Sequence, residues 1–258
     1  MKQFILETGP DTSGQVSLSG KHFHYLAKVR RLAPGEYFPA LLPDGGQVTI
    51  KVLTVDKNSL TGLVISGDAS SQAASLPPIY LFQALPKGDK MDLIVRQAAE
   101  GAVSRIVPFT SGFSVAKYNN SGQKFVRWQK IIKEARQQSG SLTATEISQP
   151  ETFDGIFSCW EQIKTQSEDA LGLLMHHVPL ANESLHRYLG KNRIANGPVV
   201  LAIGPEGGFS PAEAERFMAA GFKMFTFGGT ILRTETAALY AAAAVRIILM
   251  ERDSWETN

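Results

Sequence analysis

A glycine-rich turn, Gly204 to Gly208, follows the continuous apolar run Pro198 to Ile203 in this chain of 258 residues. Such a run is typical of a strand that is buried on both faces. After the turn, Ser210 and Glu213 stand at the spacing of a helix-capping pair, with a proline at the first helical position between them. Open α/β sheets bind ligands at turns of this kind, between a buried strand and the start of a helix. The sequence therefore predicts a candidate binding turn here.

The composition of this turn limits the chemistry that it can perform. It has no side chain with the reactivity of a nucleophile. Gly207 and Gly208 can adopt positive φ angles and let backbone N–H groups approach a ligand closely. The glycine spacing is neither that of a dinucleotide-binding turn nor that of a P-loop. On spacing alone, a tight structural turn is the more frequent explanation.

A second stretch, "KMFTFGGTILRTETAALYAAAAVRIIL", repeats the order of strand, glycine pair and helix. Arg233 follows two aliphatic residues, and Thr234 or Thr236 can cap the helix. Two glycine turns at neighbouring strand ends can jointly enclose a flat, neutral ligand such as adenosine. No residue of either turn supplies phosphate-binding chemistry, which disfavours ATP as the ligand.

The elements that position these turns change in type at Ser66 to Pro78, a small, polar stretch that is typical of a linker. Before it, β-forming residues surround turn signals at residues 44–46 and 56–58, and we expect one short helix within residues 20–32. After it, short apolar runs alternate with helical patterns, which favours a mostly parallel sheet covered by helices. Between Thr152 and Lys191 we predict only a strand at "LGLLMH". The chain is therefore expected to form a small β-rich domain over residues 1–72 and an α/β domain over residues 73–258.

The charges are unevenly distributed, although the formal net charge is only +2. Residues 73–140 contain ten lysines and arginines against four acidic residues. This basic segment is either a surface for a polyanion or a solvated helix face, and charge alone does not distinguish the two. Its helix around residues 125–136 has an apolar stripe that we expect to face the core, made of Phe125, Trp128, Ile132 and Ala135. Arg136 lies close to this stripe, so it is either a side chain that extends to solvent or a functional residue at the edge of a cleft, and the first is the expected arrangement.

Several classes of protein are disfavoured. The single cysteine, Cys159, excludes an internal disulfide framework and fits a reducing, cytoplasmic compartment. The longest apolar run, Ala237 to Val245, is too short to span a bilayer, so we expect no membrane insertion. Neither the pair His22 and His24 nor the adjacent pair at 176 and 177 has the further ligands of a metal site, so we expect no metal.

Four stretches together closely resemble the bacterial 16S rRNA (uridine-N3)-methyltransferases, which belong to the SPOUT superfamily of knotted methyltransferases. They are "LPKGDKMDLIVRQAAE", "RWQKIIKEARQQSG", "IGPEGGFSPAEAE" and "ILRTETAALYA". A fifth, "HYLAKVRRLAPGE", is similar to the family's N-terminal signature, and the similarity covers nearly the whole chain in the same order. The resemblance implies a SPOUT-type α/β domain with a deep trefoil knot, a mostly parallel sheet and helices on both faces. It also implies a preceding small, RNA-binding PUA-like β-barrel.

The same resemblance implies S-adenosyl-L-methionine as the cofactor, bound in a bent form against three loops at the knot. Carried onto this sequence, the cofactor-binding positions are Leu85, Pro86, Ile203, Gly204, Pro205, Glu206, Gly207, Gly208, Phe227, Gly228, Gly229, Ile231, Leu232, Arg233 and Thr236. In the expected reaction, uracil N3 attacks the sulfonium methyl group, the bond between sulfur and methyl breaks, and S-adenosylhomocysteine leaves. The cationic Arg233 can stabilise negative charge that develops on a uracil oxygen. Glu206 or Glu235 can accept the proton or hold the base. Turn stabilisation by Glu206 and helix-dipole pairing by Glu235 are equally good explanations.

For RNA contacts the candidates are exposed cations of both domains: Lys28, Arg30, Arg31, Arg127, Lys130 and Lys133. Contacts of this kind go mainly to phosphate. The resemblance further implies 16S rRNA of the small ribosomal subunit as partner and a homodimer formed through the knotted domain. Some family arginines are replaced, as at Gly112 and Phe113, while the cofactor loops keep the family pattern.

We therefore expect a cytoplasmic, S-adenosylmethionine-dependent methyltransferase that acts on N3 of a specific uridine in 16S rRNA. Two alternatives stay open. One is an enzyme of the same superfamily that methylates another RNA site, and the other is a non-catalytic RNA-binding factor of ribosome assembly.

Overall fold

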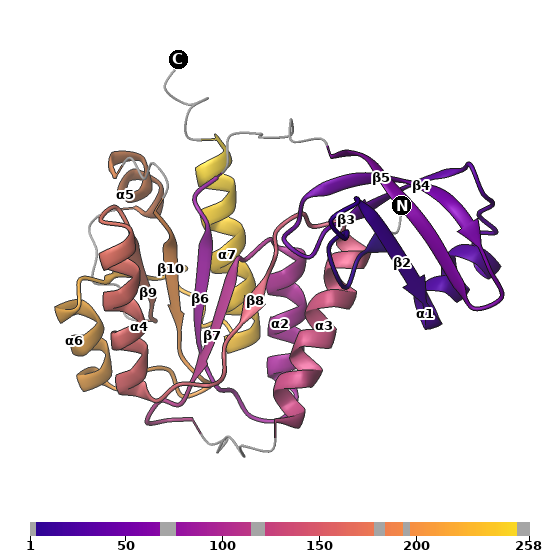
Figure 1. Cartoon of the computed structure of the whole chain (residues 1–258). Coiled ribbons are helices and arrows are strands. Elements are labelled where there is room, and N and C mark those ends of the chain that lie inside the picture. Colours follow the sequence, from indigo (N-terminus) through magenta and orange to yellow (C-terminus); the bar gives the residue numbers. More distant parts are fainter. Residues whose placement is uncertain (1–3, 68–75, 115–121, 178–183, 193–196, 252–258) are drawn as a thin grey trace. The chain divides into compact units, whose positions relative to one another are not determined.

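The computed structural model describes residues 4–67, 76–114, 122–177, 184–192 and 197–251, and Figure 1 traces the whole chain. The chain divides into two compact units. The first contains Met1–Ala73 and Arg136–Ala144, and the second contains Ala74–Ala135 and Thr145–Asn258. The domain boundary expected between residues 72 and 73, and most of the expected linker, lie outside the described residues.

The first unit is built on a five-stranded sheet with strand order β1-β3-β4-β5-β2. Its strands are β1 (Phe4–Ile5), β2 (Gln15–Ser19), β3 (Tyr37–Leu41), β4 (Gln47–Val55) and β5 (Ser59–Gly67). The predicted turns at residues 44–46 and 56–58 connect β3 to β4 and β4 to β5, which are antiparallel pairs. Helix α1 (Gly20–Phe23) and the π-helix η1 (His24–Val29) occupy the stretch where one short helix was predicted. Side chains of the sheet and of these helices form one apolar core.

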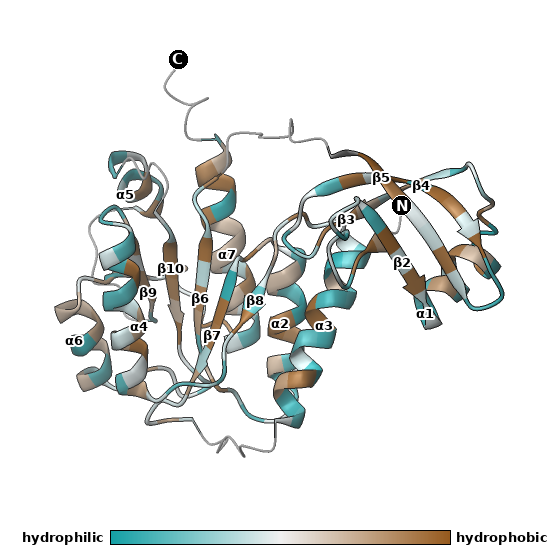
Figure 2. Cartoon of the chain, in the orientation of Figure 1, coloured by the Kyte–Doolittle hydropathy of each residue, from teal (hydrophilic) through white to brown (hydrophobic). Residues whose placement is uncertain are grey.

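The second unit has a six-stranded sheet in the order β11-β9-β10-β6-β7-β8. Its strands are β6 (Ile79–Ala84), β7 (Arg105–Phe109), β8 (Glu146–Ile147), β9 (Leu171–Met175), β10 (Val199–Ile203) and β11 (Lys223–Phe225). All the pairs are parallel, as predicted. Every residue of β10 is buried, and Figure 2 shows the hydrophobic colour along β9 and β10. Because all the strands are parallel, their carboxyl ends meet at one edge of the sheet.

Helices cover both faces of this sheet. They are α2 (Lys90–Glu100), α3 (Gln123–Ser139), α4 (Phe153–Gln166), α5 (Leu185–Lys191), α6 (Pro211–Ala219) and α7 (Thr234–Glu251). Residues of α2, α3, α5 and α7 share a core with one face, and residues of α4 and α6 share a second core with the other. Figure 1 shows α4 and α6 beside each other, separated from α2 and α7 by the strands. The predicted fold class, a parallel α/β domain preceded by a small β domain, is confirmed.

The sequence predictions missed α4 and α5 and misjudged Arg136. Helix α4 is capped by Thr152, whose hydroxyl accepts the Gly155 N–H at 2.9 Å, and buries Trp160 at 2 % exposure. Arg136 was expected to extend to solvent, and this prediction is wrong, since only 6 % of the residue is exposed. Burial lowers the pKa of its guanidinium, and the charge of Asp44 partly opposes this shift.

Among the described residues, no helix is long and apolar enough to cross a membrane.

Candidate functional site

A cleft of about 410 Å³ opens at the carboxyl ends of the central strands of the second unit. Its walls come from the segments that follow β9, β10 and β11 and from the start of α7. The lining residues are Met175, His176, His177, Ile203, Gly204, Pro205, Glu206, Gly207, Gly208, Phe209, Thr226, Phe227, Thr230, Ile231, Leu232, Arg233, Thr234 and Ala237. The volume falls in the range of small-molecule sites, about 300–1,000 Å³. The cleft therefore lies where the sequence predicts ligand binding.

The turn after β10 strongly favours glycine at three positions. A Cβ atom on Gly204 would lie 2.9 Å from the carbonyl carbon of Gly208, which is backbone and cannot swing aside. Gly208 has a φ of +69°, in the left-handed region that favours glycine. A Cβ atom on Gly207 would lie 3.0 Å from the Cβ atom of Phe113. Close packing around the turn thus requires the glycines and leaves its backbone bare toward the cleft.

Capping hydrogen bonds at the start of α6 hold the end of the loop that follows the glycine turn. The Ser210 hydroxyl accepts the Glu213 N–H at 3.3 Å, and the Glu213 carboxylate accepts the Ser210 N–H at 2.8 Å. This is the predicted capping pair. The same carboxylate accepts the N–H of Gly112 at 2.7 Å, which connects α6 to the segment after β7.

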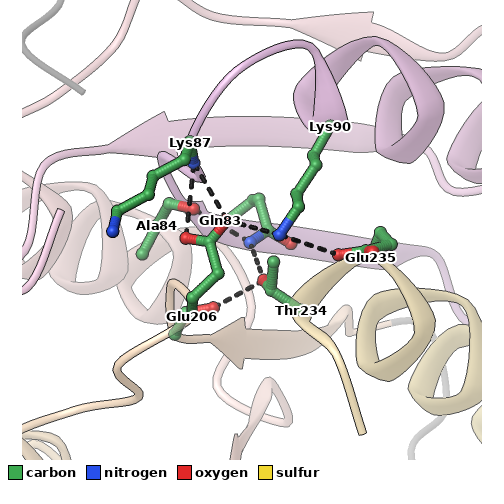
Figure 3. Close-up of polar contacts among 8 residues, drawn as sticks. Gln83, Ala84, Lys87, Lys90, Glu206, Thr234 and Glu235 are labelled. Carbon is green, nitrogen blue, oxygen red and sulfur yellow. Dashed lines mark hydrogen bonds and ion pairs between the residues drawn. The ribbon is translucent and has the colours of Figure 1, made fainter. Parts of the chain in front are cut away.

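A buried polar chain connects the two glycine turns (Figure 3). The Gln83 amide nitrogen donates to the Thr234 hydroxyl at 3.0 Å, and that hydroxyl donates to the Gly204 carbonyl at 2.6 Å. Gln83 is fully buried at the end of β6, and Thr234 is the first residue of α7. Buried hydrogen bonds of this kind are costly to break. These hydrogen bonds therefore hold the end of β6, the turn after β10 and the start of α7 together.

Lys90 lies between Glu206 and Glu235, the two carboxylates that the sequence analysis names as candidate catalytic residues. Its Nζ atom is 2.6 Å from Glu206 Oε1 and 3.8 Å from Glu235 Oε2. The backbone N–H of Lys87 also donates to Glu206, at 3.1 and 3.3 Å from its two oxygens. Partial burial by itself raises the pKa of Glu206, but the hydrogen bonds from Lys90 and from backbone N–H groups outweigh it and lower this pKa overall. Glu206 is thus an ionised, well-held carboxylate.

The cofactor residues predicted from the sequence divide into two groups. Those that line the cleft are Ile203, Gly204, Pro205, Glu206, Gly207, Gly208, Phe227, Ile231, Leu232 and Arg233. Those that are not among its lining residues are Leu85, Pro86, Gly228, Gly229 and Thr236. Leu85 is 4 % exposed and belongs to the apolar core, and its N–H donates to the carbonyl of Phe109. Glu235, a predicted catalytic residue, also lies outside the lining.

Sequence reasoning missed the two histidines of the cleft. His176 and His177 follow β9 directly, and their rings stack with centroids 4.5 Å apart. Burial lowers the pKa of His176, and the neighbouring His177 lowers it further. Their position immediately after a parallel strand was the available signal. No group of three or more metal-ligating side chains occurs in the part of the chain that the structure describes.

The predicted RNA-contacting cations lie in both units. Lys28, Arg30 and Arg31 are exposed in or just after η1 of the first unit. In the second unit, Arg127 forms an ion pair with Asp92, and Lys130 lies 3.8 Å from Glu134. Lys133 is half-buried on the same helix.

Comparison with known proteins gives consistent matches. The family model described as "RNA methyltransferase domain" matches residues 74–246. The chain is 31% identical over 235 residues to ribosomal RNA small subunit methyltransferase E of Synechocystis, covering 91% of this chain and 73% of the relative. It is 28% identical over 243 residues to the protein of the same name from Bacillus subtilis, covering 89% and 88%. A crystal structure of ribosomal RNA small subunit methyltransferase E from Neisseria gonorrhoeae, bound to S-adenosyl methionine, is similar with a TM-score of 0.75 and 25% identity, covering 96% and 98%.

Proposed function

The chain belongs to the RNA methyltransferase family, and from this premise we propose that it transfers a methyl group from S-adenosylmethionine to N3 of a uridine in 16S rRNA. The observation that carries this proposal is the cleft at the carboxyl ends of β9, β10 and β11, which is lined by the glycine turn after β10 and by residues on either side of the second glycine pair. The relatives named for methylation of the small-subunit RNA support the substrate class.

The residues of the cleft fit S-adenosylmethionine. Ile203, Phe227 and Leu232 offer apolar surface for an adenine ring. The bare backbone at Gly207 and Gly208 allows close approach of a ribose or an amino-acid moiety. When bound, the cofactor supplies an electrophilic methyl group on a sulfonium centre. The protein's part is to hold that group and the uracil at attack distance.

Arg233 is the candidate for electrostatic stabilisation of the reacting uracil. It lines the cleft, and among the described residues no carboxylate forms an ion pair with it. A guanidinium with unneutralised charge stabilises the negative charge that grows on a uracil carbonyl oxygen as N3 loses its proton. The methyl-transfer step therefore depends on Arg233 more than cofactor binding does.

Glu206 and Glu235 are proposed to hold the site together. The sequence leaves each of them open as a proton acceptor or as a structural residue. The contacts of both with Lys90 support the structural role. For Glu206 the lowered pKa supports it further, because a carboxylate with a lowered pKa is a weaker proton acceptor.

The RNA is proposed to contact both units through phosphate. Residues 1–72 act as an RNA-binding domain that uses Lys28, Arg30 and Arg31, and residues 73–258 form the methyltransferase domain. On α3 the candidates are Arg127, Lys130 and Lys133, of which Arg127 forms an ion pair with Asp92 and Lys130 lies 3.8 Å from Glu134. Phosphate contacts make the binding dependent on salt. We propose the cytoplasm as its location, because the proposed substrate is ribosomal RNA.

A second copy of the chain is the proposed partner of α7. This helix exposes four large apolar side chains, Leu239, Tyr240, Ile247 and Met250. It is also rich in alanine, which allows close approach of another helix. We propose that this face forms the interface of a homodimer, and the molar mass in solution tests it.

The proposed function is tested by transfer of labelled methyl from S-adenosylmethionine to small ribosomal subunits from cells that lack the enzyme. Nucleoside analysis should recover the label as 3-methyluridine. Label in another nucleoside would keep the enzyme class and change the target. No label from a folded protein would refute catalysis on this RNA and favour the non-catalytic alternative.

A further inference from the structure

Lys90 stands where a lysine is electrostatically unfavourable. It is the first residue of α2, and the partial positive charge at a helix N-terminus repels a cation. The two carboxylates in reach of its Nζ atom, Glu206 and Glu235, offset this repulsion. A lysine at this position is therefore stabilised by its two carboxylate partners.

The two partners belong to two different segments that line the cleft, although Glu235 is not itself a lining residue. Glu206 is part of the turn after β10, and Glu235 lies two residues after Arg233 in the first turn of α7. Lys90 itself is not among the lining residues. Figure 3 shows its side chain extending from α2 to a point between the two carboxylates. One cation thus connects both walls without occupying the space of the ligand.

Two features make these contacts stronger than an ordinary surface ion pair. Surface ion pairs contribute little because solvent screens them and the side chains stay mobile. Here the Glu206 carboxylate is also held by the Lys87 N–H, and its contact with Lys90 is a 2.6 Å hydrogen bond. The Glu235 side chain is only 13% exposed, and its Oε2 atom is buried without a hydrogen-bond partner among the described residues. Lys90 is therefore the cation that faces the largely buried Glu235 carboxylate.

We propose that Lys90 is a positioning residue that holds the turn Gly204–Gly208 and the first turn of α7 in the arrangement that binds S-adenosylmethionine. It touches no reacting group, so it acts on cofactor affinity and leaves the transfer step unchanged. This inference rests on the proposed function for the identity of the ligand.

The test compares two variants of Lys90. Lys90→Met keeps a side chain of similar length and removes the charge, and Lys90→Arg keeps the charge. The matched control is Arg96→Met, which removes an exposed cation from the same helix. Binding of S-adenosylmethionine is measured by calorimetry on the full chain. Loss of a hydrogen bond between charged groups should weaken the affinity of Lys90→Met about tenfold. Lys90→Arg should recover most of the affinity, and Arg96→Met should bind like the wild type.

Kinetics separate positioning from catalysis. In Lys90→Met, the KM for S-adenosylmethionine should rise in step with the loss of affinity, while kcat at saturating cofactor stays at the wild-type value. Unchanged affinity in a folded Lys90→Met protein would overturn the inference. So would a fall in kcat with unchanged KM.

Two further outcomes are distinguishable. If Lys90→Met does not fold, Glu235→Gln removes only the longer of the two ion pairs and must still weaken cofactor binding; wild-type affinity in that variant would also overturn the inference. If the wild-type protein itself binds no S-adenosylmethionine, the proposed function and this inference are both refuted. Wild-type binding that Lys90→Met leaves intact refutes the inference alone.

Discussion

The hydroxyl of Thr234 donates a hydrogen bond of 2.6 Å to the carbonyl of Gly204, between residues 30 positions apart in the chain. Through it, the start of the last helix is joined to the glycine turn that lines the cleft. The same hydroxyl accepts a hydrogen bond from the buried Gln83. Three segments of the site thus depend on one oxygen atom.

Replacing Thr234 by valine keeps the shape of the side chain and removes this oxygen. The Gly204 carbonyl and one N–H of Gln83 then lose a buried partner, so the free energy of unfolding should fall by about 1–3 kcal/mol. Urea denaturation measures this change. Thr234→Ser keeps the hydroxyl and should lose much less. Equal losses in the two variants would show that the methyl group, rather than the hydrogen bonds, stabilises the site.

Gly204→Ala should damage the turn that lines the cleft. The new Cβ atom would lie 2.9 Å from backbone of Gly208, so one of the two backbone segments must move. Overpacking of this kind costs about 1–3 kcal/mol, which corresponds to roughly 5-fold to 150-fold weaker cofactor binding if the bound state needs the original turn. Calorimetry with S-adenosylmethionine measures the affinity.

Gly190→Ala is the control for this variant. A Cβ atom on Gly190 meets no atom within 4 Å, and the residue lies near the end of α5. Alanine there should be neutral or stabilise the helix by up to about 1 kcal/mol. If Gly204→Ala binds the cofactor as tightly as Gly190→Ala does, close packing of the turn is not required for binding.

The lowered pKa of Glu206 predicts a dependence of stability on pH. A carboxyl whose pKa is lower in the folded than in the unfolded protein stabilises the fold fully above the unfolded pKa, about 4.3. This contribution is lost as the pH falls through the lower pKa of the folded protein. The wild type should therefore exceed Glu206→Gln in unfolding free energy at pH 7, and the difference should shrink as the pH falls below about 4. A difference that stays constant from pH 7 to pH 3 would contradict the role of its charge.

Features of the fold and site that were predictable from sequence are those that depend on neighbouring residues. The apolar run of β10, the glycine turn and the capping pair of Ser210 and Glu213 all lie within one short stretch. Helix α4 was missed because Gly155 weakens its first turn, and its stability comes from contacts such as the 2.8 Å hydrogen bond between Trp160 and the Ala220 carbonyl.

Long-range contacts were not predictable in the same way. Lys90 and Glu206 are 116 residues apart, and Gln83 and Thr234 are 151 apart, so no local pattern relates them. Arg136 was misjudged because helical periodicity places it beside the apolar stripe but does not reveal that the residue is buried. A lysine at the first position of α2 was an available signal, because the helix dipole disfavours it.

Arg233→Ala should separate cofactor binding from methyl transfer. Arg233 lines the cleft without an ion-pair partner among the described residues, so removing it breaks no such contact that holds the walls together. S-adenosylmethionine should therefore bind with nearly wild-type affinity. Loss of the cation should leave the developing charge on uracil unstabilised and lower kcat by about a hundredfold or more. Calorimetry and labelled methyl transfer to small subunits measure the two effects on the same preparation.

Arg233→Lys keeps the charge but not the planar group and should retain part of the activity. If affinity and kcat fall together in Arg233→Ala, the side chain supports the cofactor pocket and the stabilisation of uracil must come from another group.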